Sequence, residues 1–238
     1  MKKLLIAATL VLSLGAGTAS ADTVWIDSIV DGWENPSGGL FVNIDNDPNP
    51  GTDTIRWGWP TGFGGQSGYD WNSSNVPFSV QTGSIFSLGQ FTHHNNPIFA
   101  NTSITSVDLS FDVGNFEAPS NLNATFTFWH DETPNQSPCG FPSSSTCDDF
   151  VEITGAFFDA PIIDNGGKHY YFTLLGFSTD GGETTSLQFQ TKENKANKAK
   201  LYAVITEAPI GVPDGGATLA LLGGALLGLG ALRRRVGL

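Results

Sequence analysis

Apolar and polar residues alternate strictly along several short segments of this chain. Every second residue from Val107 to Val113 is apolar, and the same holds from Ala124 to Phe128. In an extended chain such residues share one face, whereas a helix would scatter them around its axis. This period of two therefore predicts β-strands with one buried face.

The rest of the region between residues 22 and 211 fits the same interpretation. Gly, Pro, Asn, Asp and Ser recur every several residues and punctuate the strand patterns, and no segment there keeps a helical period. We expect an all-β fold, an antiparallel two-sheet sandwich with a jelly-roll-like arrangement; a closed barrel is the alternative. Further strands are predicted at residues 150–153, 170–175, 187–189 and 200–206.

The segment from Lys192 to Lys200 is the one stretch whose composition suggests a helix. It reads KENKANKAK, has no apolar face and lies between two strand patterns. We therefore expect an exposed hairpin loop or a strand extension, with solvated lysines.

The N-terminus has the three parts of a secretory signal peptide. Lys2 and Lys3 precede an apolar run at residues 4–14, and Ala19-Ser20-Ala21 forms an A-x-A cleavage site. Residues 1–21 are thus predicted to be a signal peptide, which makes the secretion machinery a partner and the protein an exported one.

The C-terminal region combines a turn motif, an apolar run and a basic cluster. The uncharged run at residues 217–232 would form a helix about 24 Å long, slightly short of a full hydrocarbon core. The arginines would stay cytoplasmic, which leaves the preceding domain outside. The motif consists of Val212, Pro213, Asp214, Gly215 and Gly216, and the cluster of Arg233, Arg234 and Arg235.

This tripartite tail, residues 212–238, resembles the PEP-CTERM sorting signals, in particular the VPDSG type, with Gly215 in place of Ser. The resemblance implies cleavage near Pro213 by an exosortase-type enzyme. It also implies a Gram-negative bacterium that makes exopolysaccharide or biofilm, with only transient anchoring in the inner membrane. An ordinary single-pass anchor is the alternative.

The region left between the two targeting segments, residues 22–211, has a length that suits one domain. It holds 6 Lys and Arg against 22 Asp and Glu. Such a surface repels nucleic acid and anionic lipid, so we expect neither as a partner. We expect a plain acidic surface that favours solubility; an ion-binding role is the alternative.

The chain has two cysteines, Cys139 and Cys147, in the sequence PCGFPSSSTCDD. Exported proteins meet an oxidising compartment, and the spacing is wider than the C-x-x-C of redox sites. We expect a structural disulfide that closes a small loop.

A series of motifs across residues 50–206 resembles the choice-of-anchor K domain, a family of bacterial surface domains found with different C-terminal anchors. The resemblance implies a location at the cell surface and specifies no chemistry. Its most specific part is residues 91–98, FTHHNNPI. The other parts are residues 55–60, 66–69, 86–90, 138–149, 174–177, 189–194 and 201–203.

Two polar features are candidates for a metal or a structural role. His93 precedes Asn95-Asn96-Pro97, and we expect it to stabilise that turn, because no other histidine shares a ligand spacing with it. An acidic loop offers alternating oxygen ligands for Ca²⁺, although it lacks the glycine and glutamate of an EF-hand. Its weak candidate ligands are Asp45, Asp47, Asn49 and Asp53.

Binding of carbohydrate is the alternative to a purely structural role. Trp57, Trp59 and Trp71 lie in a glycine-rich stretch, and exposed rings stack on sugars, whereas buried ones would fill the core. On a strand, Trp57 and Trp59 would share one face.

The chain has no nucleophile elbow, phosphate loop or dinucleotide motif, so we do not expect an enzyme. A glycan hydrolase is the third possibility, because paired carboxylates are available. We predict a structural or interaction protein of the cell surface or exopolysaccharide matrix. The candidate carboxylates are Asp131, Glu132, Asp148, Asp149 and Glu152.

Overall fold

The computed structural model describes residues 21–47, 51–114, 122–154, 161–163 and 168–207. All the regular structure in these ranges is β-strand, and every strand pairing is antiparallel. The predicted all-β class is therefore confirmed. The described part of the chain contains no helix that could span a membrane. The predicted helix at 217–232, the sorting motif and residues 1–20 of the signal peptide lie outside the described residues.

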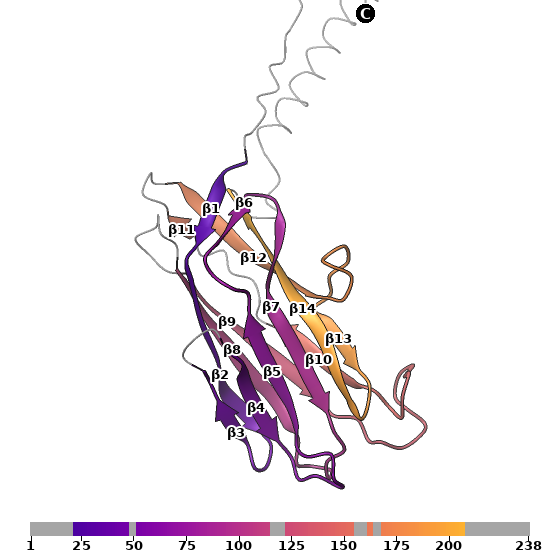
Figure 1. Cartoon of the computed structure of the whole chain (residues 1–238). Coiled ribbons are helices and arrows are strands. Elements are labelled where there is room, and N and C mark those ends of the chain that lie inside the picture. The colour runs from indigo at the N-terminus through magenta and orange to yellow at the C-terminus, as the bar shows by residue number, and fades with distance from the viewer. Residues whose placement is uncertain (1–20, 48–50, 115–121, 155–160, 164–167, 208–238) are drawn as a thin grey trace, which may run out of the picture.

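Two large sheets make up the body of the domain (Figure 1). The five-stranded sheet has the order β13-β10-β9-β8-β2, and the seven-stranded sheet has the order β11-β12-β14-β7-β5-β4-β3. The first consists of β2 (Ser28–Gly38), β8 (Ile104–Gly114), β9 (Leu122–Asp131), β10 (Asp149–Thr154) and β13 (Gln188–Thr191). The second consists of β3 (Asn43–Asp45), β4 (Asp53–Trp57), β5 (Ser67–Ser73), β7 (Ile85–Asn95), β11 (Pro161–Ile163), β12 (His169–Ser178) and β14 (Lys195–Thr206). A separate ribbon pairs β1 (Thr23–Ile26) with β6 (Phe78–Gln81).

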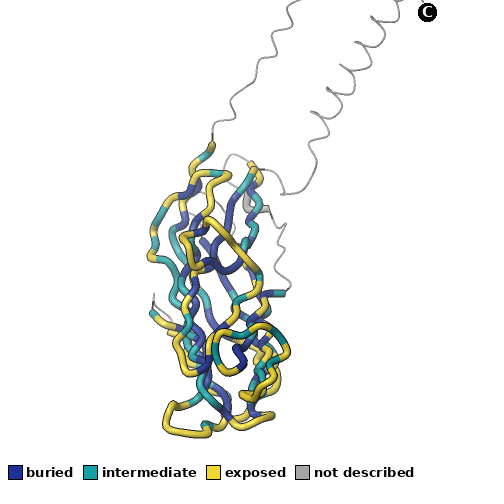
Figure 2. The backbone as a smooth tube through the Cα atoms, turned by 90° about the vertical axis from the view of Figure 1, so that its right-hand side faces the viewer, coloured by how far each residue is buried: buried dark blue, intermediate teal, exposed yellow. Residues whose placement is uncertain are grey.

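The alternating apolar residues form the core between the two large sheets. In β8, Val107, Leu109, Phe111 and Val113 are all buried, as the sequence predicts. Figure 2 shows buried backbone along the strands and exposed backbone mainly at the turns and ends. Rings from the two sheets meet directly: Trp33 of β2 lies 5.5 Å from Tyr69 of β5, between ring centroids. This contact makes the fold a sandwich; the jelly-roll-like connectivity stays a prediction.

The segment at residues 192–200 is a strand extension, one of the two predicted forms. The chain turns at Lys192–Asn194 after β13 and continues as β14, so it crosses from the five-stranded to the seven-stranded sheet at this point. Lys195 and Lys198 are exposed, but Glu193 is only 6% exposed. The crossing thus buries one acidic residue of a segment that the sequence predicts to be solvated.

Candidate functional site

A group of polar side chains is buried between the sheets, at the end where β7 and β9 finish. Strand alternation places them there: His93 follows Phe91 on the inward face of β7, and His130 follows Phe128 on that of β9. Asp149 precedes Val151 on the inward face of β10. The apolar core therefore continues into a polar cluster of His93, His130 and Asp149, each at most 5% exposed.

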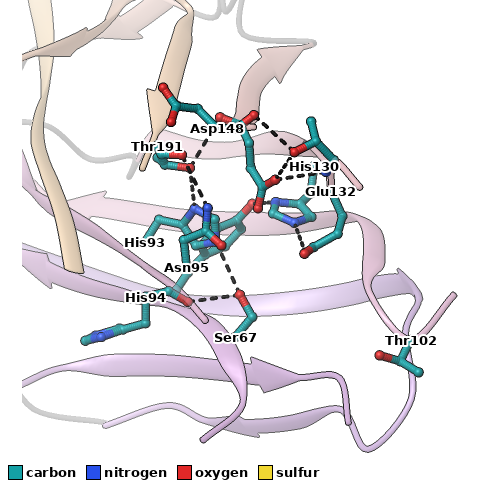
Figure 3. Close-up of polar contacts among 12 residues, drawn as sticks. Ser67, His93, His94, Asn95, Thr102, His130, Glu132, Asp148 and Thr191 are labelled. Carbon is teal, nitrogen blue, oxygen red and sulfur yellow. Dashed lines mark hydrogen bonds and ion pairs between the residues drawn. The ribbon is translucent and has the colours of Figure 1, made fainter. Parts of the chain in front are cut away.

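His93 lies inside β7, which extends to Asn95, and not beside a turn. This corrects the expectation that it stabilises the Asn95-Asn96-Pro97 turn. Its Nδ1 lies 2.8 Å from the Thr191 hydroxyl and its Nε2 3.4 Å from that of Ser67 (Figure 3). Burial, reinforced by the neighbouring His130, holds the pKa of His93 well below its usual range, so the imidazole is neutral at pH 7.

His130 links the cluster to both sheets. Its Nδ1 lies 2.7 Å from the hydroxyl of Tyr69, a residue of β5 in the opposite sheet. Its Nε2 lies 3.2 Å from Oε2 of Glu132, one residue past the end of β9. The rings of His93 and His130 are 5.1 Å apart between centroids. The sequence gives these histidines no shared ligand spacing, yet sheet packing brings them together.

Asp149 has two oxygens in different environments. Oδ1 accepts a hydrogen bond from the backbone N–H of Thr133 at 2.8 Å and lies 3.0 Å from the Thr133 hydroxyl. Oδ2 is buried and has no hydrogen-bond partner in the described part of the protein. Burial and the nearby Glu132 carboxylate raise the pKa of Asp149 to about 7, against the opposing effect of His130.

Glu193 completes the acidic side of the cluster. Burial and then the charge of Glu132 raise its pKa to about 7, although Asn135 and Asn95 donate hydrogen bonds to it. Ligating atoms of Glu132, Asp149 and Glu193 all lie within 4.8 Å of one another, and the same holds for His93, His130 and Asp149. These two triads share Asp149 and are the groups of described residues that could hold a metal ion.

A pocket of about 500 Å³ borders this cluster. His130 and Glu132 are among its lining residues, and the others come from residues 98–105 and 131–136. The Glu132 side chain is 17% exposed whereas that of His130 is fully buried, so solvent reaches the edge of the cluster at Glu132.

The disulfide supports the same region. Cys139 and Cys147 are bonded, and the Cys147 carbonyl accepts a hydrogen bond from the Thr133 hydroxyl, 2.7 Å away. Burial alone would raise the pKa of Asp148, but hydrogen bonds from Ser145 and Ser144 outweigh it and lower the pKa to about 2. Asp148 is thus an ionised cap of the loop and is separate from the two triads.

The three tryptophans predicted for glycan binding lie in different environments. Trp57 and Trp71 are fully buried, and the indole N–H of Trp71 donates to Asp31 at 2.8 Å. Trp59 is 57% exposed. The prediction that Trp57 and Trp59 share a face is wrong, because β4 ends at Trp57 and Gly58 turns the chain with φ +87°. Only Trp59 of the three can contact a ligand in solution.

Trp59 belongs to an exposed aromatic group that the sequence analysis did not identify. Its ring lies 5.9 Å from Phe41 and 5.8 Å from Phe99, both edge-to-face, and Phe41 and Phe99 are themselves exposed. We call these three residues the aromatic patch; Phe63, in the loop that follows Trp59, is fully exposed as well. Glycine on both sides of Phe63 was the available signal, because it indicates a loop that cannot bury a ring.

The acidic loop does not assemble a cation site among the described residues. Asp45 is exposed on β3, whereas Asp53 is buried and accepts a hydrogen bond from the backbone N–H of Asp47 at 2.7 Å. None of these three belongs to a described group of clustered ligands. Asn49 lies outside the described residues, so a Ca²⁺ role for the whole loop stays a prediction.

Comparison with known proteins identifies a motif in the C-terminal tail. Residues 211–236 match the VPDSG-CTERM motif, and no curated protein matches the chain.

The VPDSG-CTERM match supports a PEP-CTERM-type sorting tail, and hence an exported, surface-associated protein processed by an exosortase-type enzyme. The resemblance of residues 50–206 to the choice-of-anchor K domain stays a prediction.

Proposed function

We propose that this protein is an interaction component of the cell surface or exopolysaccharide matrix, and that it binds glycan through the aromatic patch. The observation that carries this proposal is the exposure of Phe41, Trp59 and Phe99 as one contiguous group. Exposed large rings are costly in water, and a contiguous group of them marks a binding surface more often than scattered ones do. A non-catalytic role in binding is part of the proposal.

The position of the patch supports this role. Strand β7 ends near the patch, at Asn95. Asn95 pairs with Lys195, the first residue of β14. Thr206, where β14 ends and the chain leads toward the sorting tail, lies at the opposite end of the sandwich (Figure 1). A protein held by its tail would therefore present the aromatic patch away from the membrane.

Hydrogen bonds between three loops hold the patch in place. The Phe99 N–H donates to the Trp59 carbonyl at 2.8 Å, and the Trp59 N–H donates to the Thr102 hydroxyl at 3.1 Å. Gln66 donates from its side-chain amide to the carbonyl of Phe41 at 2.8 Å. Rings on a braced backbone lose little entropy on binding, which favours recognition of a ligand.

The chemistry around the patch suits sugars. Aromatic rings stack on the apolar faces of sugar rings, and the adjoining pocket offers polar side chains, among them Asn101, Asn135 and Gln136. The acidic surface of the domain disfavours polyanions, so we propose a neutral or cation-bridged exopolysaccharide.

The test is binding of the full chain to a panel of soluble polysaccharides and oligosaccharides, followed by tryptophan fluorescence and calorimetry. We expect binding to at least one neutral glycan, and a loss of at least tenfold in affinity for Trp59→Ala, about 1.4 kcal/mol. Trp129→Ala is the matched control, because Trp129 is 52% exposed on β9 of the five-stranded sheet, whereas Trp59 follows β4 of the seven-stranded sheet.

Three outcomes would overturn the proposal. Absence of binding across the panel would favour a passive structural role in the matrix, and equal affinity of Trp59→Ala and the parent would move the binding surface elsewhere. Release of reducing ends from any glycan would show a hydrolase.

A further inference from the structure

We propose that His93, His130 and Asp149 bind one divalent transition-metal ion between the sheets, with Glu132 and Glu193 completing the site on the side of the pocket. This site is distinct from the aromatic patch and does not depend on glycan binding.

The proposed ligands already lie close to one another. The ligating atoms of each triad lie within 4.8 Å of one another, and both triads contain Asp149. Metal–ligand bonds of about 2.0–2.2 Å separate two ligands on one ion by about 3–4.4 Å. Only small side-chain shifts are therefore needed to close either triad around an ion.

One carboxylate oxygen of Asp149, Oδ2, lacks a hydrogen-bond partner among the described residues. The residue is fully buried, and Thr133 occupies Oδ1. Buried polar atoms almost always have a partner, and leaving one without a partner is costly. A metal ion bound at Oδ2 would supply the missing interaction.

Hydrogen bonds orient the imidazoles of His93 and His130. Ser67 donates its proton to the His94 carbonyl at 2.9 Å, so the Nε2–H of His93 donates to Ser67. Nδ1 then accepts from the Thr191 hydroxyl at 2.8 Å, and a metal ion bound at Nδ1 would replace that hydrogen bond. On His130, Nδ1–H donates to the Tyr69 hydroxyl when Nε2 binds metal. Imidazole ligands usually donate their second N–H in this way, which fixes the ring for metal binding.

The acidic side of the cluster concentrates carboxylates. Glu132, Asp149 and Glu193 converge in a space where the described ion pairs supply only His130 as a partner, to Glu132. Asp149 is fully buried and Glu193 is only 6% exposed, so water does little to compensate their charge. A dication bound between them would balance the charge of these three carboxylates.

The donor set selects the class of metal. Two imidazole nitrogens with carboxylate oxygens suit Zn²⁺, Mn²⁺ or Fe²⁺, whereas Ca²⁺ takes oxygen ligands alone. Glu132 lines the pocket with a side chain that is 17% exposed, and this is the side from which an ion would enter.

The experiment uses untagged full-length chain treated with chelator, then titrated with Zn²⁺ or Co²⁺ in excess Mg²⁺. Magnesium occupies non-specific carboxylates on the acidic surface. We expect one equivalent of metal per chain, a visible Co²⁺ spectrum of nitrogen and oxygen ligands, and paramagnetically shifted resonances from two imidazoles. Asp149→Asn and His130→Gln should each weaken binding at least tenfold.

Two control variants change a residue next to a proposed ligand while leaving the ligands themselves intact. His94→Gln removes an imidazole next to His93 that contacts Asp70 instead, and Asp148→Asn removes a carboxylate next to Asp149. Both should bind Zn²⁺ like the parent. Circular dichroism of each metal-free variant checks folding, and Glu193→Gln, expected to weaken binding, replaces any variant that does not fold.

The proposal fails if the parent chain binds no stoichiometric Zn²⁺ or Co²⁺ in excess Mg²⁺. It fails equally if the imidazole resonances stay unshifted in Co²⁺, or if His94→Gln weakens binding as much as His130→Gln does. Any of these results would leave the cluster as a hydrogen-bonded polar core.

Discussion

His93 and His130 lie on facing sheets with their ring centroids 5.1 Å apart, directly beyond the stacked pair of Phe91 and Phe128, whose centroids are 5.4 Å apart. The histidines thus extend the inter-sheet contact made by the phenylalanines one alternation further along each strand. At this end of the sandwich, the same packing that buries the apolar core assembles a polar site.

Removal of the disulfide should destabilise the domain and loosen the wall of the pocket. The bond closes a short loop between Cys139 and Cys147, and chain entropy assigns such a loop about 2–3 kcal/mol. We expect the double variant Cys139→Ser, Cys147→Ser to unfold about 5–10 °C lower than the parent. Calorimetry with and without reductant provides the measurement. An equal Tm for reduced and oxidised parent would contradict the prediction.

Asp53 should make stability depend on pH. Burial, with the adjacent Asp31 carboxyl, raises its pKa to about 7, whereas an unfolded aspartate has a pKa of about 3.9. As pH rises, the unfolded chain therefore loses this proton first, and the free energy of unfolding falls between about pH 4 and pH 7.

Asp53→Asn should remove that dependence while its amide oxygen still accepts the N–H of Asp47. Between about pH 4 and pH 7, the free energy of unfolding of the variant should rise relative to that of the parent. Above about pH 7, the difference between the two free energies should be constant. Urea unfolding over a pH series measures the difference, and parallel curves for the two proteins would refute the assignment.

Two tryptophans should differ sharply in their contribution to stability. Trp33 is 1% exposed and contacts rings of both sheets, whereas Trp129 is 52% exposed. Trp33→Ala should cost about 3–5 kcal/mol and Trp129→Ala less than about 0.5 kcal/mol. The difference is measured as the shift of the urea midpoint at constant m-value; similar shifts would show that the sheets do not pack as described.

Processing of the tail can be read from the mass of the native protein. The VPDSG-CTERM match at residues 211–236 implies cleavage, and we expect a mature C-terminus near Pro213. Replacing Pro213 and Asp214 by alanine should leave the tail in place, whereas the same change at Ser178 and Thr179 should not affect processing. A native protein with an intact tail in the inner membrane would contradict the prediction.

Much of the fold was predictable because strand geometry is local. Residues two apart share a face whatever the rest of the chain does, so the alternation at Val107–Val113 and Ala124–Phe128 identified inward positions that the structure buries. The same alternation, continued by one step, reaches His130 from Phe128 and Asp149 from Val151. The inward orientation of these polar residues could therefore have been predicted.

The sequence by itself determined the β class, the inward face of its main strands and the sorting tail, since each depends on residues close together in the chain. Only the tertiary structure decided which inward residues meet. Sheet order and register set His93 opposite His130, and the crossing after β13 buried Glu193 in a segment rich in lysine. A turn at Gly58 separated the exposed Trp59 from the buried Trp57. These outcomes depend on contacts between distant segments, and no local period encodes them.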